Sequence, residues 1–251
     1  TFSEKIVLPK TMYPQGICFT EKYVFISLYS MEKKELGKIM VFKKENGEYV
    51  ASLGMDCKSH LGGIAYDGVN IWVCNSSNMS IERISYSFIC KFIKEHPGEN
   101  LDIRNLVERY PVNLIPSCIT FYENQLWVAT HTKQTNSQMI SYLFMKEENR
   151  LEFHRVYHIP SKVQGVAFEE DGKIILSTSY GRRRSSYLKR YSSVEAMTNN
   201  IEKYDSMIEL PPCSEGITLE DAKRILAKAR KEKLPIVDKD FNLKGLITIK
   251  D

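Results

Sequence analysis

Short segments in which apolar and polar residues alternate recur along the chain, and each is followed by a tight turn and a second apolar run. The clearest example spans residues 162–177. The second residues of five such starts stand at positions 16, 63, 118, 165 and 216, so successive starts are separated by 47, 55, 47 and 51 residues. A repeat of about 50 residues built from short strands is typical of a β-propeller or a repeat array.

Each repeat is long enough for four strands. The first two strands form a hairpin, with turn residues such as Asp67-Gly68 and Asp171-Gly172 between them. Third strands are predicted at residues 38–42, 81–85, 139–144 and 186–191, and fourth strands at residues 49–53, 88–92, 151–157 and 204–210. Residues 95–110, of which 101–110 have helical spacing, and residues 193–200 are predicted to be insertions that decorate one face.

The N-terminal segment 4–9 ends in proline, as do segments 156–160 and 207–211, which directly precede later repeat starts. No repeat precedes the N-terminal segment, so we expect it to be an outer strand that completes the last blade. Such a strand closes the ring and removes an open sheet edge.

The fifth repeat breaks the pattern after Ile217. A second strand is expected near residue 224, but Thr218 and Asp221 form a helix start, and an apolar stripe with helical spacing follows. Strands are then predicted at residues 234–238 and 243–249. The sequence therefore predicts a mainly β fold: a propeller of about five blades in residues 1–216, with four clear blades and a closing N-terminal strand, and a C-terminal α/β module in residues 217–251.

Composition narrows the function classes. The formal charge is +4, from 35 basic and 31 acidic residues, so no global field indicates a nucleic-acid or membrane partner, and no apolar run is long enough for a membrane helix. The six cysteines and the histidines lack metal-ligand spacing, so we expect free thiols, no metal and no cofactor; a Cys118–Cys213 disulfide is left open. Trp72 and Trp127 stand at equivalent second-strand positions and are predicted to lie in the blade cores.

Polar residues at the starts of the inner strands are the first candidate site, because such side chains converge around a propeller axis. These are Gln15, His60, Ser117, Gln164 and Glu215. The alternative is that they only satisfy strand-end backbone groups. A second candidate is an anion site at Arg182, Arg183 and Arg184, since guanidinium groups suit phosphate, sulfate or carboxylate. Its alternative is a solvated hairpin.

Residues 1–216 resemble a family of secreted or cell-surface β-propeller proteins from low-GC bacteria. The likeness rests on residues 59–68, 116–118, 162–165, 177–182 and 211–216. It implies the fold and a binding face, without an assigned activity. It also implies that the propeller part is secreted or at the cell surface, with its signal peptide absent from this chain.

Residues 216–251 resemble half of a cystathionine-β-synthase (CBS) domain, most closely that of a bacterial IMP dehydrogenase. The matching segments are residues 215–222, 233–238 and 243–251. The resemblance implies that Thr248 and Asp251 hold the ribose and phosphate of a nucleotide, and that this part comes from a cytoplasmic protein. The catalytic loop of the dehydrogenase is not found in the sequence, so that activity is not implied. Residues 214–218 suit both parents, which suggests a fusion or chimera.

Three functions follow from these observations. The first is a non-catalytic propeller that binds a small ligand or a protein partner at its channel face. The second is an adenine-nucleotide-binding regulatory CBS fragment, and the third is a hydrolase or lyase acting on the propeller. The repeat pattern covers most of the chain, whereas the CBS-like segment is half of a site. The sequence therefore favours the binding protein over an enzyme.

Overall fold

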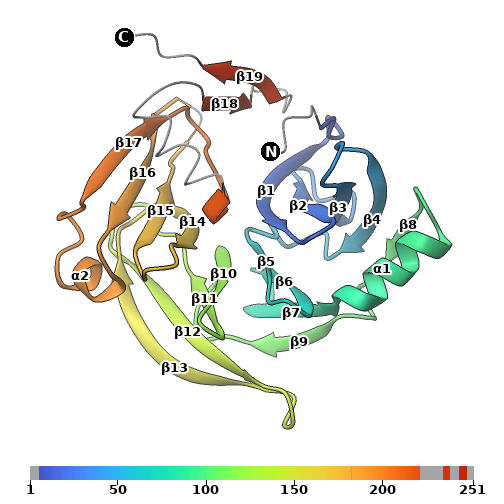
Figure 1. The fold of residues 1–251 in the computed structure, drawn as a ribbon, viewed down its shortest axis with the longest axis horizontal. Helices are drawn as coiled ribbons and strands as arrows, with labels where there is room; N and C mark the ends of the chain where they lie inside the picture. The colour runs from blue at the N-terminus through green and yellow to red at the C-terminus, as the bar shows by residue number, and fades with distance from the viewer. Residues whose placement is uncertain (1–5, 182, 221–233, 238–242, 248–251) are drawn as a thin grey trace.

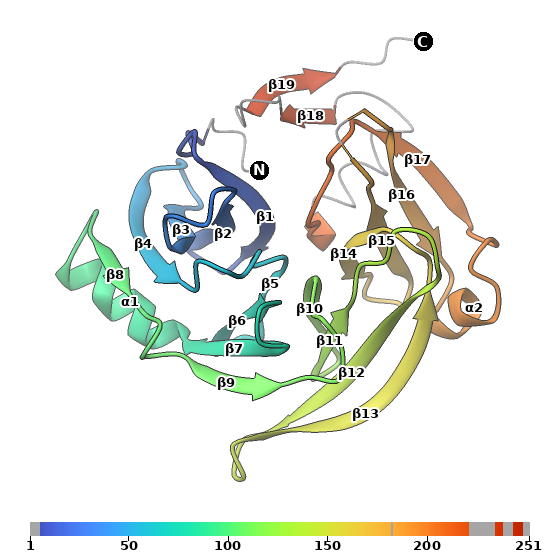
Figure 2. The ribbon, with the colours of Figure 1, turned by 180° about the vertical axis from the view of Figure 1, so that it is seen from behind.

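Four of the five repeat starts lie in, or directly before, the innermost strand of a sheet that contains four antiparallel strands. The computed structural model describes residues 6–181, 183–220, 234–237 and 243–247. In that part of the chain the four sheets stand as blades around one axis, and the innermost strands β1, β5, β10 and β14 surround it (Figures 1 and 2). The predicted mainly β propeller is confirmed, with four blades.

The blades follow the sequence order. Blade 1 comprises β1 (Met12–Phe19), β2 (Tyr23–Ser30), β3 (Gly37–Lys43) and β4 (Tyr49–Met55), extended by the parallel strand β8 (Asn100–Asp102). Blade 2 comprises β5 (Ile64–Tyr66), β6 (Asn70–Asn75), β7 (Ser80–Ser85) and β9 (Glu108–Pro111). Blade 3 comprises β10 (Cys118–Tyr122), β11 (Gln125–Ala129), β12 (Ser137–Met145) and β13 (Arg150–Ile159). Blade 4 comprises β14 (Val163–Phe168), β15 (Ile174–Thr178), β16 (Ser186–Tyr191) and β17 (Ser206–Leu210).

Apolar layers between neighbouring blades form the core. Trp72 of β6 and Trp127 of β11 occupy equivalent places in the layers between blades 2 and 3 and between blades 3 and 4, as predicted. Both are buried, and the indole N–H of each has an acceptor: Asp67 Oδ2 at 2.7 Å for Trp72 and Tyr122 O at 3.1 Å for Trp127. Each side chain therefore adds a large buried apolar area without leaving a polar atom unpaired.

The second blade departs from the prediction. Residues 88–92, predicted as its fourth strand, lie in helix α1 (Tyr86–Glu95), and the segment predicted to be helical supplies β8 and β9 instead. The Ser85 hydroxyl caps the helix by accepting from the N–H of Phe88 at 3.4 Å. Ile89 and Ile93 point into the layer between blades 1 and 2. Helical spacing and a cap therefore prevail over the strand propensity of this run. The insertion at 193–200 contains helix α2 (Val194–Asn199).

The predicted closing strand at the N-terminus is not formed by residues 6–9. They have no strand assignment, and Val7 is 68% exposed. Ile6 and Leu8 instead pack against the outer apolar face of blade 1, beside Met12 and Ile26. A strand needs the edge of another sheet, and the described residues contain no four-stranded fifth blade with which this segment could pair.

The sector between blade 4 and blade 1 is filled differently from the others. Residues 214–218 carry the fifth repeat start, and a helix begins at Leu219, in agreement with Thr218 as its predicted cap. The rest of the predicted helix lies outside the described residues. Strands β18 (Leu234–Val237) and β19 (Leu243–Ile247) pair antiparallel and lie at the rim of this sector (Figures 1 and 2).

Candidate functional site

The five repeat starts approach one another closely around the axis, and four of them carry glycine at the point of closest approach, whereas the third carries Cys118. A Cβ added to Gly63 would lie 2.5 Å from the backbone nitrogen of Ile119, and one added to Gly216 would lie 2.9 Å from the carbonyl oxygen of Gln15. No side chain fits at such distances, so the glycines allow neighbouring backbones to touch. The fifth start therefore occupies the place of a fifth inner strand, although residues 214–218 are not in a sheet.

Hydrogen bonds connect the starts of blades 1 and 2. The Ser27 hydroxyl donates to the carbonyl of Leu61 at 2.8 Å and accepts from the N–H of Gly16 at 3.0 Å. These bonds place the Gln15 segment beside the His60 segment. The His60 ring stacks on Tyr29 with centroids 4.4 Å apart.

The contacts continue around the ring to blades 3 and 4. The Ser117 hydroxyl accepts from the N–H of His131 at 3.1 Å, and Nδ1 of His131 lies 3.3 Å from the carbonyl of Val163, the residue before Gln164. The Ser117 and Gln164 segments are therefore joined through one histidine, by its backbone N–H on one side and its ring on the other.

The last two contacts bring in the fifth start. The hydroxyl of Ser177, which occupies in blade 4 the place of Ser27 in blade 1, donates to the carbonyl of Ser214 at 3.5 Å. The N–H of Gly216 donates to the carbonyl of Gln15 at 2.9 Å and completes the circle. The five predicted residues thus stand at successive places around one axis. The convergence of their side chains on a common ligand stays a prediction.

The axis itself is closed. The void between the inner strands has a volume of about 10 Å³ and is lined by the paired repeat-start residues together with Gln164. That volume is about enough for one water molecule. The axis itself therefore has no room for a ligand larger than a water molecule.

Burial sets the protonation of three groups near the axis. Burial raises the pKa of Glu215 to about 7, and within the described part of the chain its carboxylate has no hydrogen bond or ion pair. Burial lowers the pKa of His60, with a further contribution from Lys33. It also lowers the pKa of His131, partly offset by the bond to Val163. At neutral pH the imidazoles are neutral and Glu215 is partly protonated, so Glu215 could accept or donate one proton.

Of the other two predicted sites, the anion site lies partly within the described residues and the nucleotide site lies outside them. Arg183 is exposed, and the guanidinium carbon of Arg184 lies 5.6 Å from the centre of the Tyr180 ring, whereas Arg182 lies outside the described residues. Thr248 and Asp251 also lie outside them. Both the anion site and the nucleotide site therefore stay predictions.

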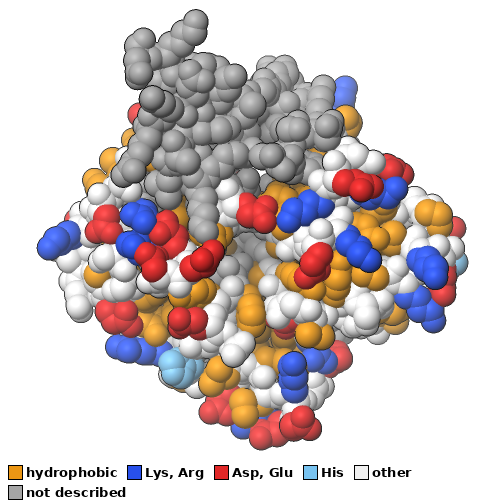
Figure 3. Space-filling view, in the orientation of Figure 1, with side chains coloured by type: hydrophobic (Ala, Val, Ile, Leu, Met, Phe, Trp, Pro, Cys, Tyr) orange, Lys and Arg blue, Asp and Glu red, His pale blue; other side chains and the backbone are white. Residues whose placement is uncertain are grey.

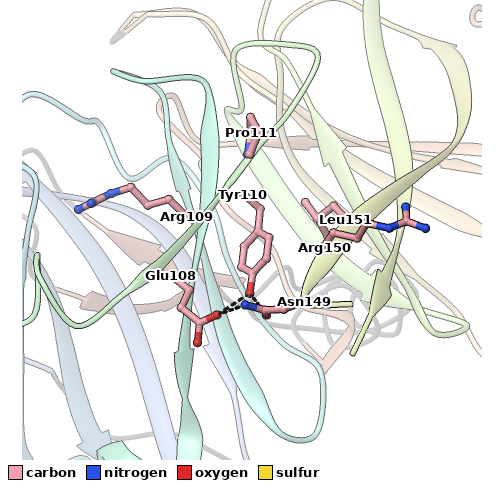
Figure 4. Close-up of a pocket in the computed structure, with 7 residues that line it drawn as sticks. All are labelled: Glu108, Arg109, Tyr110, Pro111, Asn149, Arg150 and Leu151. Carbon is pink, nitrogen blue, oxygen red and sulfur yellow. Dashed lines mark hydrogen bonds between the residues drawn. The ribbon is translucent and has the colours of Figure 1, made fainter. Parts of the chain in front are cut away.

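A depression of about 450 Å³ between β9 and the β12–β13 turn was not predicted from the sequence (Figure 4). At its wall Glu108 Oε2 accepts from the Tyr110 hydroxyl at 2.8 Å and from Asn149 Nδ2 at 2.9 Å, and Arg83 forms an ion pair with Glu108 at 2.7 Å. Bonds to these three donors hold the pKa of Glu108 at about 2. The polar atoms satisfy one another and join blade 2 to blade 3. Asn149 is 41 residues from Glu108, so no local motif could have revealed the network.

Cysteines and clusters of metal-binding side chains are the other places where the described residues could carry chemistry. Cys118 is buried and Cys213 is exposed, and the disulfide between them that the sequence left open is not formed. Burial raises the pKa of Cys118 to about 12, which keeps that thiol protonated. Within the described ranges no group of three His, Cys, Asp or Glu residues could hold a metal ion, and no helix is long and apolar enough to cross a membrane. Figure 3 shows acidic and basic side chains interspersed on the face in view.

Comparison with solved structures concerns the fold. The crystal structure of glutaminyl cyclase from Myxococcus xanthus superposes with a TM-score of 0.55 at 11% identity, covering 100% of this chain and 97% of that one. At this identity the similarity supports the propeller fold alone.

Comparison with protein families concerns the C-terminal part. The CBS domain family matches residues 197–251, whereas the sequence placed the boundary at residue 217. The match therefore includes the end of α2 and all of β17, which the structure uses in blade 4.

The curated relatives are inosine-5′-monophosphate dehydrogenases. The Bacillus subtilis protein is 44% identical over 108 residues, which cover 39% of this chain and 20% of the relative. The Halalkalibacterium halodurans protein is 31% identical over 132 residues, covering 51% and 25%. The chain spans about a quarter or less of the length of these relatives. It thus combines a four-bladed propeller-like arrangement with a C-terminal CBS domain segment similar to those of inosine-5′-monophosphate dehydrogenases.

Proposed function

We propose that the propeller is a non-catalytic binding module that holds a small ligand, or a segment of a protein partner, over the mouth of its closed axis. The observation that supports the proposal is the set of hydrogen bonds and backbone contacts that links the repeat-start segments of Gln15, His60, Ser117, Gln164 and Glu215 around the axis. Polar groups that converge on a concave face of a rigid scaffold are the usual make-up of a ligand site.

Two features favour a ligand over purely structural roles. Glu215 has no counter-ion in the described part of the chain, although a buried carboxylate is costly unless it is paired or protonated. The close-packed backbones below it leave space for about one water, so the floor of the site is rigid and little ordering entropy is lost on binding.

Calorimetry with a library of small molecules and peptides tests the proposal. Gln164→Ala and Glu215→Ala are expected to weaken binding at least tenfold, since each removes a polar partner from the mouth. Gln138→Ala, which removes an exposed glutamine from β12, is the matched control and should leave affinity unchanged. Binding that is insensitive to Gln164→Ala and Glu215→Ala would place the ligand elsewhere and refute the proposal.

The CBS domain match supports a second candidate function, nucleotide binding by the C-terminal segment through Thr248 and Asp251. Residues 216–251 resemble one CBS half, and the nucleotide cleft is normally shaped by two halves, so we expect this segment by itself to bind ATP, AMP or GTP only feebly. Titration with each nucleotide tests this expectation. Dissociation constants in the low micromolar range, abolished by Asp251→Ala, would make nucleotide binding the primary function.

The origin of the two parts is also a proposal. The resemblance of residues 1–216 to secreted propellers supports a secreted or cell-surface origin for that part, and the similarity to inosine-5′-monophosphate dehydrogenases supports a cytoplasmic origin for the rest. Limited proteolysis tests the boundary: cleavage between residues 216 and 234 that leaves a folded N-terminal fragment is expected if the propeller is the independent unit.

A further inference from the structure

Two cationic side chains share the ring of Tyr180. Lys162 Nζ and the guanidinium carbon of Arg184 each lie 5.6 Å from its centroid. Neither cation has an ion pair among the residues that the structure describes. Two like charges held at one aromatic ring repel each other, and the quadrupole of the phenol offsets only part of that repulsion.

The backbone holds Lys162 in an unusual conformation. Its φ angle is 65°, in the left-handed region that non-glycine residues seldom adopt. Two hydrogen bonds maintain it: the Lys162 N–H donates to Thr132 O at 2.8 Å, and the Ser179 N–H donates to Lys162 O at 2.9 Å. Strained residues that the surrounding structure over-determines are concentrated at binding sites. The lysine is thus held at the junction of blades 3 and 4, two residues before Gln164.

Further positive charge lies close by. Lys133 and Lys162 both contribute to the lowered pKa of His131, after burial. Glu215, the carboxylate of the adjacent repeat start, is a poor counter-ion because burial raises its pKa to about 7. The contact of Cys213 Sγ with the carbonyl of Gly181 at 3.6 Å brings the segment before Glu215 against the Tyr180 loop.

We infer that the junction of blades 3 and 4 binds the anionic group of a small molecule, a carboxylate or a phosphate, between Lys162 and Arg184. An anion there neutralises the two cations, and the guanidinium group can donate two parallel hydrogen bonds to it. This inference rests on the proposed function, because it places the charged end of the ligand at the same mouth. It names the charged group of the ligand as a carboxylate or a phosphate, and Lys162 as its main determinant.

Titration at constant ionic strength tests the inference, with inorganic phosphate and pyrophosphate in one arm and acetate and citrate in the other. Lys162→Asn removes the cation while keeping a residue that tolerates the left-handed backbone, and Arg184→Gln removes the second cation. Each change is expected to lower affinity about tenfold, the size expected for one charge-assisted hydrogen bond. The arm that binds more tightly identifies the anionic group.

Lys189→Gln is the matched control, because Lys189 Nζ lies 5.2 Å from the Tyr204 ring in the same blade, as a single cation on one ring. It should leave affinity unchanged. Equal loss in this control, or absence of anion binding by the unaltered chain at millimolar concentrations, overturns the inference.

Failure of the inference can be told apart from failure of the proposed function. Binding of a neutral ligand that is weakened by Gln164→Ala but not by Lys162→Asn refutes the anion site and leaves the proposed binding face in place. Anion binding that depends on Lys162 and Arg184 but not on Gln164 or Glu215 refutes the proposed mouth and leaves the anion site. Thermal unfolding of every variant shows that a loss of affinity is not a loss of fold.

Discussion

The seam between blades 2 and 3 and the seam between blades 4 and 1 are built from the same repeat but are closed by different means. One continuous apolar layer spans the first, and the Glu108 network ties its rim. At the second seam, the face of blade 1 and the face of blade 4 that border it carry separate apolar clusters. The described contacts that bridge them there include the Gly216–Gln15 hydrogen bond and the ion pair between Lys44 and Glu220 at 3.4 Å.

The difference shows that a repeat start can keep its contacts around the axis without a complete four-stranded blade behind it. Residues 214–218 retain the inner contacts of a repeat, including the bonds from Ser177 and to Gln15, without a four-stranded sheet behind them in the described part of the chain. In a repeat fold each unit is stabilised by its neighbours, so the seam that lacks a full sheet should be the weakest place in the ring.

The largest expected effect on stability comes from truncating one buried isoleucine at each seam. Ile81→Ala and Ile175→Ala each remove a fully buried isoleucine, from the layer between blades 2 and 3 and from the blade 4 cluster facing the fifth sector. We expect a loss of about 4 kcal/mol of unfolding free energy for Ile81→Ala and about 2 kcal/mol for Ile175→Ala, since a less enclosed cavity can collapse. Urea denaturation measures both, and equal losses would show that the seams are packed alike.

A smaller effect is expected from filling the axis. Gly63→Ala puts a methyl group between β10 and the residue directly before β5, whereas Gly216→Ala puts one between β1 and a segment outside any sheet. We expect losses of about 3 kcal/mol and about 1 kcal/mol respectively, because only the second site can shift to relieve the contact. Melting temperatures of the two variants give the order, and the reverse order would contradict the proposed rigidity of the closed seam.

The two seams should also differ in the sign of their pH dependence. Burial raises the pKa of Glu215 from 4.5 to about 7, so between these values the folded chain keeps a proton that the unfolded chain has lost, and stability falls as pH rises. Glu108 has the opposite effect on stability. Its pKa is about 2 in the folded chain, below the ordinary 4.5, so its contribution to the stability of the fold is lost as pH falls from 4.5 toward 2. Glu215→Gln should therefore gain stability over the unaltered chain, on the order of 1 kcal/mol above pH 7 and close to none at pH 4. Unfolding at several pH values measures the gain, and a gain independent of pH would exclude titration of Glu215 as its cause.

The smallest effect separates the two equivalent serines. Ser27→Ala removes a hydroxyl with partners at 2.8 Å and 3.0 Å, and should cost about 1 kcal/mol. Ser177→Ala removes a bond of 3.5 Å and should cost less than about 0.5 kcal/mol. Equal costs in chemical denaturation would indicate that the fifth start is held as firmly as the second.

The sequence pattern was sufficient to predict those features whose signal lies within one short segment. The repeat starts, their hairpins, the core places of Trp72 and Trp127 and the cap at Thr218 depend on alternation, turn residues or helix capping within a few residues. The same reasoning failed between residues 86 and 111, because a short apolar run satisfies both strand and helix periods and only packing against blade 1 decides between them.

The sequence by itself determined that a repeat of about 50 residues builds a propeller and that the repeat ends after Ile217, because side-chain alternation and helix signals are local properties of the backbone. The tertiary structure alone decided the rest. Residues 6–9 form no strand because a strand needs a partner edge, the axis is closed because four separate glycines meet, and Lys162 and Arg184 share a ring because blade 4 folds their segments together. Each of these depends on residues distant in the chain, whose contact follows only from the packing of whole blades.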